Sequence, residues 1–255
     1  MLRHWRRHRR LSQLALAEQA GISARHLCCL EVGRARPSRE MAQLLGMALD
    51  LPLADRNGLH MAAGFVPPYS AHGLAAPQLG HVRQALDFIL RQQEPFPAIV
   101  LDGDWDMPMR NTAAVRVFAP FQARYDMPTV LARNAAHVVF HPQGLRPFMA
   151  NWDEFAGQML DTLRRVAALG HQGALRLLPA IMVYPGLPRR AQGGGSPVTA
   201  MELVLGSARL RFFSTLTSFA MPADAALQTL KVECFYPADD ATAAHCRTQA
   251  QERVI

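Results

Sequence analysis

The chain has 255 residues and half of them are apolar, so it can bury one large core or two smaller ones. No apolar run approaches the ~20 residues that a membrane helix needs, and no apolar segment follows the N-terminal arginines as in a secretory signal. We therefore expect a cytoplasmic protein with no membrane partner. The formal net charge is +7, and residues 1–50 hold nine arginines against four acidic residues. Such a basic region suits a polyanion, because bound cations release condensed counterions.

Five short helices are predicted in residues 1–64, which would form an all-α domain. Ser12 and Ser23 are suited to accept hydrogen bonds from free backbone N–H groups at helix starts, and Pro37–Ser38 precedes another helix. Gly21 lies between two helical stretches, where a left-handed turn favours a residue without a Cβ. The predicted helices span residues 2–10, 12–19, 23–32, 39–49 and 52–63.

The second and third of these helices have the spacing of a helix-turn-helix. Their inward positions are apolar: Leu16, Ala17, Ala20, Ile22, Leu27 and Leu30. This motif places its second helix in the major groove of DNA. Trp5 is expected in the core or in packing between domains. Glu31 is expected to pair with an arginine or a helix end, because carboxylates repel phosphates.

Residues 65–94 are predicted to be a linker and a connecting helix. The segment 64–80 is rich in glycine and proline, which breaks helical periodicity. Apolar residues then recur at helical spacing over 81–93.

Residues 95–243 are predicted to form an α/β domain with a single antiparallel sheet packed on helices. An apolar run at 97–102 and an extended stretch from Trp105 to Arg110 precede a helix that Asn111 caps. A long amphipathic helix fits 147–169, residues 177–184 are apolar, and the glycine-rich segment 193–197 reads as a turn. Strands are predicted at 197–205, 209–219 and 227–236.

The helix pair resembles the Xre family of bacterial regulators, which is related to the Cro/CI repressors. The family motif is found as Ser12-Gln13, Leu16-Ala17, Gly21-Ile22-Ser23, Leu27, Glu31, Gly33 and Pro37-Ser38. The resemblance covers residues 2 to about 63 and implies a fold like that of the lambda repressor. The chain begins inside what is usually a helix already started, which leaves an N-terminal extension open.

The resemblance implies DNA contacts near the start of the reading helix and in the basic loop after it. Arg25 is the best base-reading candidate, since a guanidinium can bind guanine O6 and N7 together; the alternative is a solvated or phosphate-contacting arginine. Cys28 and Cys29 stand where the family often has Ser-Phe, and they fit the groove as small neutral residues or act as oxidant sensors. The predicted DNA-contacting residues are Gln13, Ser23, Ala24, Arg25, Cys28, Cys29, Arg34, Arg36 and Arg39, of which the last three suit phosphates.

The resemblance extends past the helix pair to regulators that carry an MmyB-like ligand-binding domain. It rests on residues 23–41, 52–69, 94–114, 140–156 and 237–243. It implies a PAS-like α/β domain with an apolar pocket for a fatty acid or a similar small molecule. Pocket residues are usually large and apolar with a few orienting polar groups, which suggests Trp105, Asn111, His141, Trp152, Phe155 and Met182; for each, a core or helix-capping role is the alternative.

No motif of a hydrolase, kinase, nucleotide-binding protein or metalloprotease occurs in its structural context, so we expect no enzyme. The spacing of Cys28, Cys29, Cys234 and Cys246 fits no zinc template, and no cofactor is implied. The sequence therefore predicts a homodimeric, DNA-binding bacterial transcription regulator with a ligand-sensing domain, associated with the nucleoid when bound to double-stranded DNA. The alternative is a regulator whose second domain, residues 95–243, serves only dimerisation or protein interaction.

Overall fold

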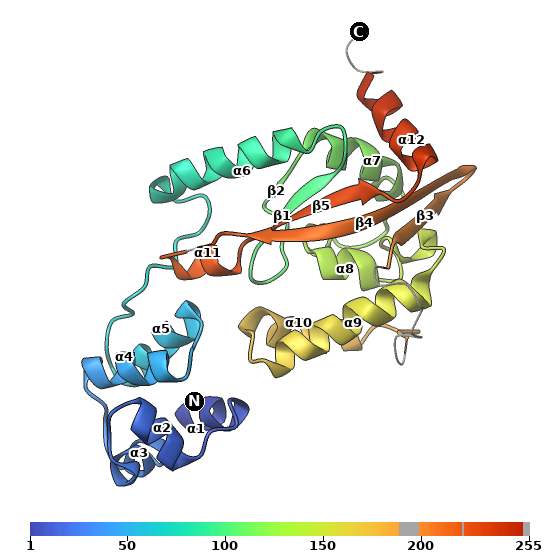
Figure 1. Ribbon diagram of the computed structural model, residues 1–255. Helices are drawn as coiled ribbons and strands as arrows, with labels where there is room; N and C mark the ends of the chain where they lie inside the picture. The colour runs from blue at the N-terminus through green and yellow to red at the C-terminus, as the bar shows by residue number, and fades with distance from the viewer. Residues whose placement is uncertain (189–198, 221, 252–255) are drawn as a thin grey trace. The chain divides into compact units, whose positions relative to one another are not determined.

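The computed structural model describes residues 1–188, 199–220 and 222–251 and divides into two compact units (Figure 1). The helical unit contains Met1–Gly73 and Phe219–Gln228. The sheet unit contains Leu74–Ser218 and Thr229–Ile255. Each unit has its own hydrophobic core.

Five helices make up the N-terminal part of the helical unit: α1 (Leu2–His8), α2 (Gln13–Gln19), α3 (Ala24–Glu31), α4 (Arg39–Ala48) and α5 (Leu53–Ala62). Their apolar faces enclose a core of Trp5, Leu16, Ala17, Ala20, Leu27, Ala42, Leu45, Leu49, Leu51 and Leu59. The prediction of five helices in this region is confirmed, and Trp5 is in the core as expected.

Side-chain caps begin three of these helices, as the sequence predicts. The hydroxyls of Ser12, Ser23 and Ser38 accept hydrogen bonds at 3.0–3.1 Å from backbone N–H groups three residues further on. Gly21 has a φ of 66°, the left-handed conformation expected between α2 and α3. The turn that orients α3 against α2 is therefore determined locally.

The connection between strands β4 and β5, residues 219–228, belongs to the helical unit. The backbone N–H of Ala225 donates to Ser70 O at 2.8 Å, and that of Leu53 donates to the Gln228 side chain at 2.7 Å. The short helix α11 (Ala225–Thr229) starts in this connection. The sequence did not predict this association, because it joins residues far apart in the chain.

The sheet unit is built on five strands in the order β2-β1-β5-β4-β3, with every neighbouring pair antiparallel. The strands are β1 (Ala98–Leu101), β2 (Met109–Arg110), β3 (Met201–Leu205), β4 (Ala208–Ser218) and β5 (Lys231–Pro237). The longer helices are α6 (Gly80–Gln92), α7 (Thr112–Gln122), α8 (Ala135–Phe140), α9 (Trp152–Ala168), α10 (Gln172–Met182) and α12 (Asp240–Gln251). Its described residues also form 3₁₀ turns at Pro77–Leu79, Leu131–Arg133 and Arg146–Phe148.

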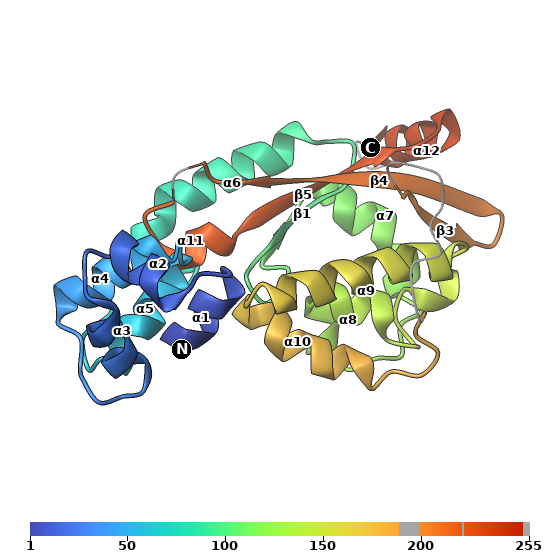
Figure 2. The same cartoon turned by 60° about the horizontal axis from the view of Figure 1, so that its bottom comes forward.

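Helices cover both faces of this sheet. In Figures 1 and 2, α8, α9 and α10 lie on one face and α6 lies on the other. Because successive strand residues point to opposite faces, Ile99 and Leu101 face the α7–α10 side, and Ala98 and Val100 face α6. The main core forms on the α7–α10 side.

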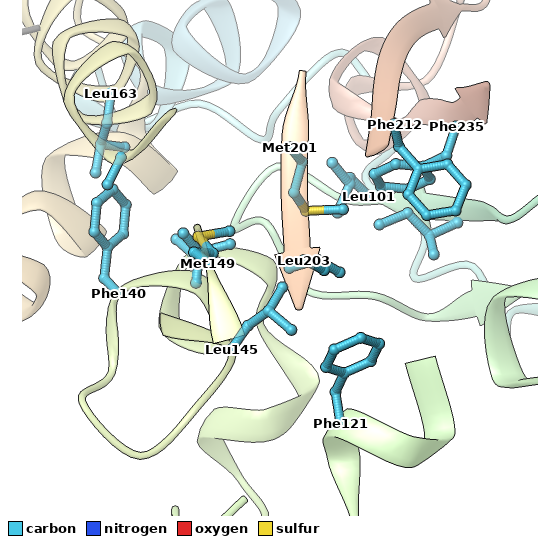
Figure 3. Packing of buried hydrophobic residues seen from close by; sticks show 14 of the residues in the cluster. Leu101, Phe121, Phe140, Leu145, Met149, Leu163, Met201, Leu203, Phe212 and Phe235 are labelled. Atoms are coloured by element: carbon cyan, nitrogen blue, oxygen red, sulfur yellow. The ribbon is translucent and has the colours of Figure 1, made fainter. Parts of the chain in front are cut away.

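Aromatic and long aliphatic side chains fill that core (Figure 3). Phe212 and Phe235 lie on adjacent strands, with ring centroids 6.4 Å apart. Figure 3 labels Leu101, Phe121, Phe140, Leu145, Met149, Leu163, Met201, Leu203, Phe212 and Phe235.

The predicted order of two strands, then helices, then three antiparallel strands is confirmed. Helix α9 starts later than the predicted residue 147, and α12 was not predicted. The apolar run 177–184 belongs largely to α10, with Pro179 inside the helix. The turn predicted at 193–197 and the first two residues of the strand predicted at 197–205 lie outside the described residues; the likeness to PAS domains stays a prediction.

Candidate functional site

A cavity of about 360 Å³ lies in the sheet unit, between the sheet and helices α7, α8 and α9. Small-molecule sites commonly measure about 300–1,000 Å³. Its apolar walls consist of Ile99, Leu101, Trp105, Met107, Phe118, Tyr125, Val138, Val139, Leu145, Phe155, Met159, Val166, Met201, Leu216 and Phe235. Such a lining favours an apolar ligand body, because burying that body removes apolar surface from water.

Trp105 lies at the cavity in an unusual backbone conformation. Its φ is 68°, which is rare for a bulky residue. Its N–H donates to Asp102 O at 3.1 Å, and the Asp102 carboxylate accepts N–H groups of Asp104 and Asp106 at 2.9 and 3.0 Å. Burial raises the pKa of Asp102. The tight turn after β1 thus aims an aromatic ring at the cavity, and strained residues of this kind cluster at functional sites.

Glu233 is an acidic residue that lines the cavity from the sheet. It lies on the central strand β5, where its cross-strand neighbours are Ile99 on β1 and Leu216 on β4. Ser214 Oγ donates to Glu233 Oε1 at 2.6 Å. Burial raises the pKa of Glu233, and the hydrogen bond from Ser214 offsets part of that rise. The neutral carboxylic acid is therefore favoured over a wider pH range than in water.

Three basic side chains also line the cavity, those of Arg110, Lys231 and His171. Arg110 and Lys231 are exposed, and in the described parts of the chain neither forms an ion pair. His171 caps α10, its ring nitrogen accepting the N–H of Ala174 at 3.5 Å. Burial lowers the pKa of His171, and the charge of Lys231 lowers it further.

Two of the six residues proposed from the sequence as ligand contacts, Trp105 and Phe155, line this cavity. Asn111 instead caps α7. Its Oδ1 accepts the N–H of Ala114 at 2.8 Å and of Ala98 at 2.9 Å, while its Nδ2 donates to the carbonyls of Phe96 and Leu90. The capping alternative noted for this residue is the one that the hydrogen bonds support.

The other three lie elsewhere in the sheet unit. His141 packs edge-on against Tyr184, with ring centroids 5.1 Å apart. Trp152 begins α9 under the Arg146 guanidinium, 4.6 Å from its ring centroid, beside a shallow surface hollow. Met182 ends α10 and is 47% exposed. None of these three lines the cavity.

The predicted DNA-contacting residues at α3 differ in their exposure to solvent. Arg25 and Cys28 are exposed, and Ala24 and Cys29 are partly buried. The Ser23 hydroxyl is engaged in capping α3. The start of α3 thus presents the exposed side chains of Arg25, His26 and Cys28.

Gln13 and Glu31 are joined to Arg6 in a polar cluster. The Glu31 carboxylate accepts Arg6 Nε at 2.6 Å and Gln13 Nε2 at 2.8 Å. The hydrogen bonds from Arg6 hold the pKa of Glu31 below its usual value. The expectation that Glu31 pairs with an arginine is confirmed, and this pair ties α1 to α3.

The arginines of the loop after α3 are exposed. Arg34 and Arg36 lie in the segment that joins α3 to α4, and Arg39 begins α4. The Arg39 guanidinium lies 5.5 Å from the centroid of the Phe65 ring. Together these residues leave positive charge accessible between the end of α3 and the start of α4.

Sequence reasoning missed Glu233 and Ser214 at the cavity. One signal was present: in the strand Lys231–Pro237, alternation places Lys231, Glu233 and Phe235 on one face. Two charged residues on the inward face of a central strand indicate a lined cavity rather than a filled core.

Within the described residues, no group of three or more His, Cys, Asp or Glu side chains could hold a metal ion. The same part of the chain contains no helix that is both long and apolar enough to cross a membrane. All four cysteines are free thiols, with Cys234 and Cys246 buried.

Residues 82–248 match the model of the MmyB-like transcription regulator ligand binding domain. This match covers well over half of the chain, which therefore belongs to that family of transcription regulators. The matched range contains the five-stranded sheet and the cavity-lining residues.

Other comparisons add little. No curated protein matches the chain. An RNA-binding light-oxygen-voltage receptor of known structure aligns with 98% of this chain at 11% identity and a TM-score of 0.29. The chain covers 61% of that receptor's length, and a likeness this low carries no argument about fold or function.

Proposed function

We propose that this chain is a sequence-specific regulator of transcription that binds double-stranded DNA through its helical unit and a small apolar ligand through its sheet unit. The observation that carries the proposal is the apolar cavity inside a domain of the MmyB-like ligand-binding family. We further propose that it acts in the cytoplasm as a homodimer and that it is not an enzyme.

Three features of the helical unit support DNA binding. Helices α2 and α3 are joined by a tight turn with Gly21 in the left-handed region, which supports a helix-turn-helix. Arg25 is exposed at the start of α3, where a guanidinium can read a guanine. Arg34, Arg36 and Arg39 are accessible to phosphates, which position the protein on the duplex without reading its sequence.

Gln13, Ser23, Ala24, Cys28 and Cys29 complete the proposed DNA-facing set. The Gln13 amide nitrogen donates to Glu31, so its second N–H and its carbonyl oxygen are the groups that reach DNA in this proposal. Ser23 contributes mainly by fixing the start of α3.

The cavity supports a ligand of the fatty-acid type or another small apolar molecule. Trp105 and Phe155 are its proposed contacts, because both line the cavity and offer large apolar surfaces. If the second domain served only dimerisation, we would expect a filled core rather than an unfilled apolar cavity.

The chain path supports coupling between the two activities. Strands β4 and β5 line the cavity through Ser214, Leu216 and Glu233, and the connection between these strands, residues 219–228, is part of the helical unit. A ligand that binds one arrangement of these strands more tightly than another would shift the population toward the first. The size of the shift is set by the difference in its affinity for the two arrangements, and the strands would pass it to the helical unit through residues 219–228.

Selection of binding sites from random DNA, with purified full-length protein, tests the DNA-binding half. A homodimer is expected to return a palindrome with half-sites separated by whole helical turns. The same operator is then titrated with and without a C8–C18 fatty-acid series. No enriched sequence would contradict DNA reading, and an enriched site whose affinity no ligand changes would favour the dimerisation role.

A further inference from the structure

The carboxyl group of Glu233 stands out in the cavity because its surroundings do not compensate a negative charge. Its hydrogen-bond partner in the described part of the chain is the neutral hydroxyl of Ser214, at 2.6 Å. Ile99, which is 7% exposed, and Leu216, which is 58% exposed, flank it across the sheet, and Phe235 follows on the same face of β5. A carboxylate among apolar groups is unfavourable unless a cation or several donors meet it.

From this placement we propose that the cavity binds an apolar molecule with a protonated amine at one end, and that Glu233 receives the ammonium group. The inference rests on the proposed ligand-sensing function and specifies its ligand class. An ammonium–carboxylate hydrogen bond is among the strongest in proteins, and its electrostatic attraction increases where water is excluded.

The other charged groups at the cavity are Asp102 after β1, Arg110 on β2, Lys231 on β5 and His171 before α10. Arg110 and Lys231 are exposed, so water weakens their pull on a ligand. Neither forms an ion pair with Glu233, although Lys231 is two residues away on the same face of β5. The Asp102 carboxylate already accepts two backbone N–H groups.

These placements give opposite expectations for two ligand classes. An amine is received on the central strand by Glu233, whereas a fatty-acid carboxylate has to be received by the exposed Arg110 or Lys231. Where Glu233 is protonated before binding, its proton leaves to solvent as the ammonium–carboxylate pair forms. Amine binding is therefore linked to proton release, and binding of a neutral alcohol is not.

Three ligands with the same twelve-carbon chain separate the alternatives: dodecylamine, dodecanol and dodecanoate. Each is titrated below its micelle concentration into full-length protein by calorimetry, in buffers of different ionisation enthalpy. We expect dodecylamine to bind with 1:1 stoichiometry, at least tenfold more tightly than the other two, and with release of up to one proton.

The variant E233Q keeps a partner for Ser214 and removes the charge. We expect it to weaken dodecylamine binding at least tenfold, to abolish the proton release and to leave dodecanol within twofold. D87N removes a carboxylate from exposed Asp87 on α6 and should change nothing.

Tighter binding of dodecanoate or dodecanol than of dodecylamine by the wild-type protein would overturn the inference while leaving ligand sensing intact. An E233Q protein that folds, by circular dichroism, and keeps the amine preference would also overturn it. Binding of none of the three ligands would overturn both the inference and the ligand-sensing proposal. The wild-type series decides the question even if E233Q fails to fold.

Discussion

A ring nitrogen of His72 lies 2.9 Å from a carboxylate oxygen of Asp224, although the two residues are 152 positions apart in the chain. The same carboxylate accepts the backbone N–H groups of His72, Ala226 and Leu227. Asp224 therefore holds the β4–β5 connection against the C-terminal part of the helical unit. Four donors on one buried carboxylate make it the main polar anchor of this contact.

Replacing that anchor, in D224A, is expected to destabilise the helical unit by about 1–3 kcal/mol, since partly buried backbone donors lose their acceptor. Urea unfolding of full-length protein measures the loss, with D87A as the exposed control. If the coupling proposal is right, D224A also reduces the effect of ligand on operator affinity. An unchanged ligand effect in a folded D224A protein would contradict it.

Arg25→Ala is expected to weaken the free energy of binding to the selected operator by about 1–3 kcal/mol. It should also reduce the sequence preference at one base pair. Arg36→Ala is the matched control, since a phosphate contact weakens binding to all sequences and lowers the salt slope by about one. Fluorescence anisotropy at several salt concentrations separates the two. Equal losses on operator and random DNA for Arg25→Ala would remove it from the base-reading set.

Glu31→Ala is expected to destabilise the helical unit by about 3–5 kcal/mol, because it leaves Arg6 without its partner in a site where the two side chains are 1% and 11% exposed. The lowered pKa of Glu31 means that its contribution is present above 4.5 and is lost as the pH falls through the folded-state pKa. Chemical unfolding at pH 3–7 tests both statements. E18A, on the exposed side of α2, should stay within about 0.5 kcal/mol of the wild type, and a double variant with R6A should cost less than the sum of the single changes.

Gly173→Ala is expected to destabilise the sheet unit by about 1–3 kcal/mol through overpacking. A Cβ at position 173 would overlap the carbonyl oxygen of Gly103, a backbone atom that cannot rotate away. Gly80→Ala is the control, because the atom nearest to its new Cβ is an Arg83 side-chain nitrogen at 3.9 Å. Thermal unfolding should give a clearly lower midpoint for Gly173→Ala than for Gly80→Ala. Equal midpoints would contradict the close packing of Gly173 against Gly103.

Glu233 is expected to make the wild-type protein less stable as the pH rises. Its pKa is raised in the folded state, so the stability linked to its protonated form is complete below the unfolded value of about 4.5 and is lost as the pH rises through the folded-state pKa. E233Q should flatten the part of the stability curve that lies above pH 4.5. A curve that keeps its slope in E233Q would assign the dependence to other groups.

Local chemistry made much of the helical unit predictable. Ser12, Ser23 and Ser38 cap helices through residues three positions away, so the sequence contains both partners of each bond. The docking of residues 219–228 depends instead on partners up to 175 positions away, which no local pattern reveals. Helix α12 escaped prediction for another reason: its buried residues are Thr242, Ala243 and Cys246, and it lacks a stripe of large apolar side chains.

The candidate site was only partly predictable for a similar reason. Aromatic residues such as Trp105 and Trp152 look alike in the sequence, and only the packing separates the one at the cavity from the one under Arg146. Glu233 had a readable signal in strand alternation, but its apolar cross-strand neighbours come from two other strands.

The chain crosses between the two units three times, after Gly73, after Ser218 and after Gln228. Residues 1–73 are therefore not the whole of the helical unit. A gene fusion or a proteolytic cut near residue 73 separates Ser70 and His72 from Ala225 and Asp224, with which they form hydrogen bonds. A chimaera that exchanges residues 1–73 must also carry residues 219–228 from the same parent. We therefore expect the two parts of such a regulator to be inherited together.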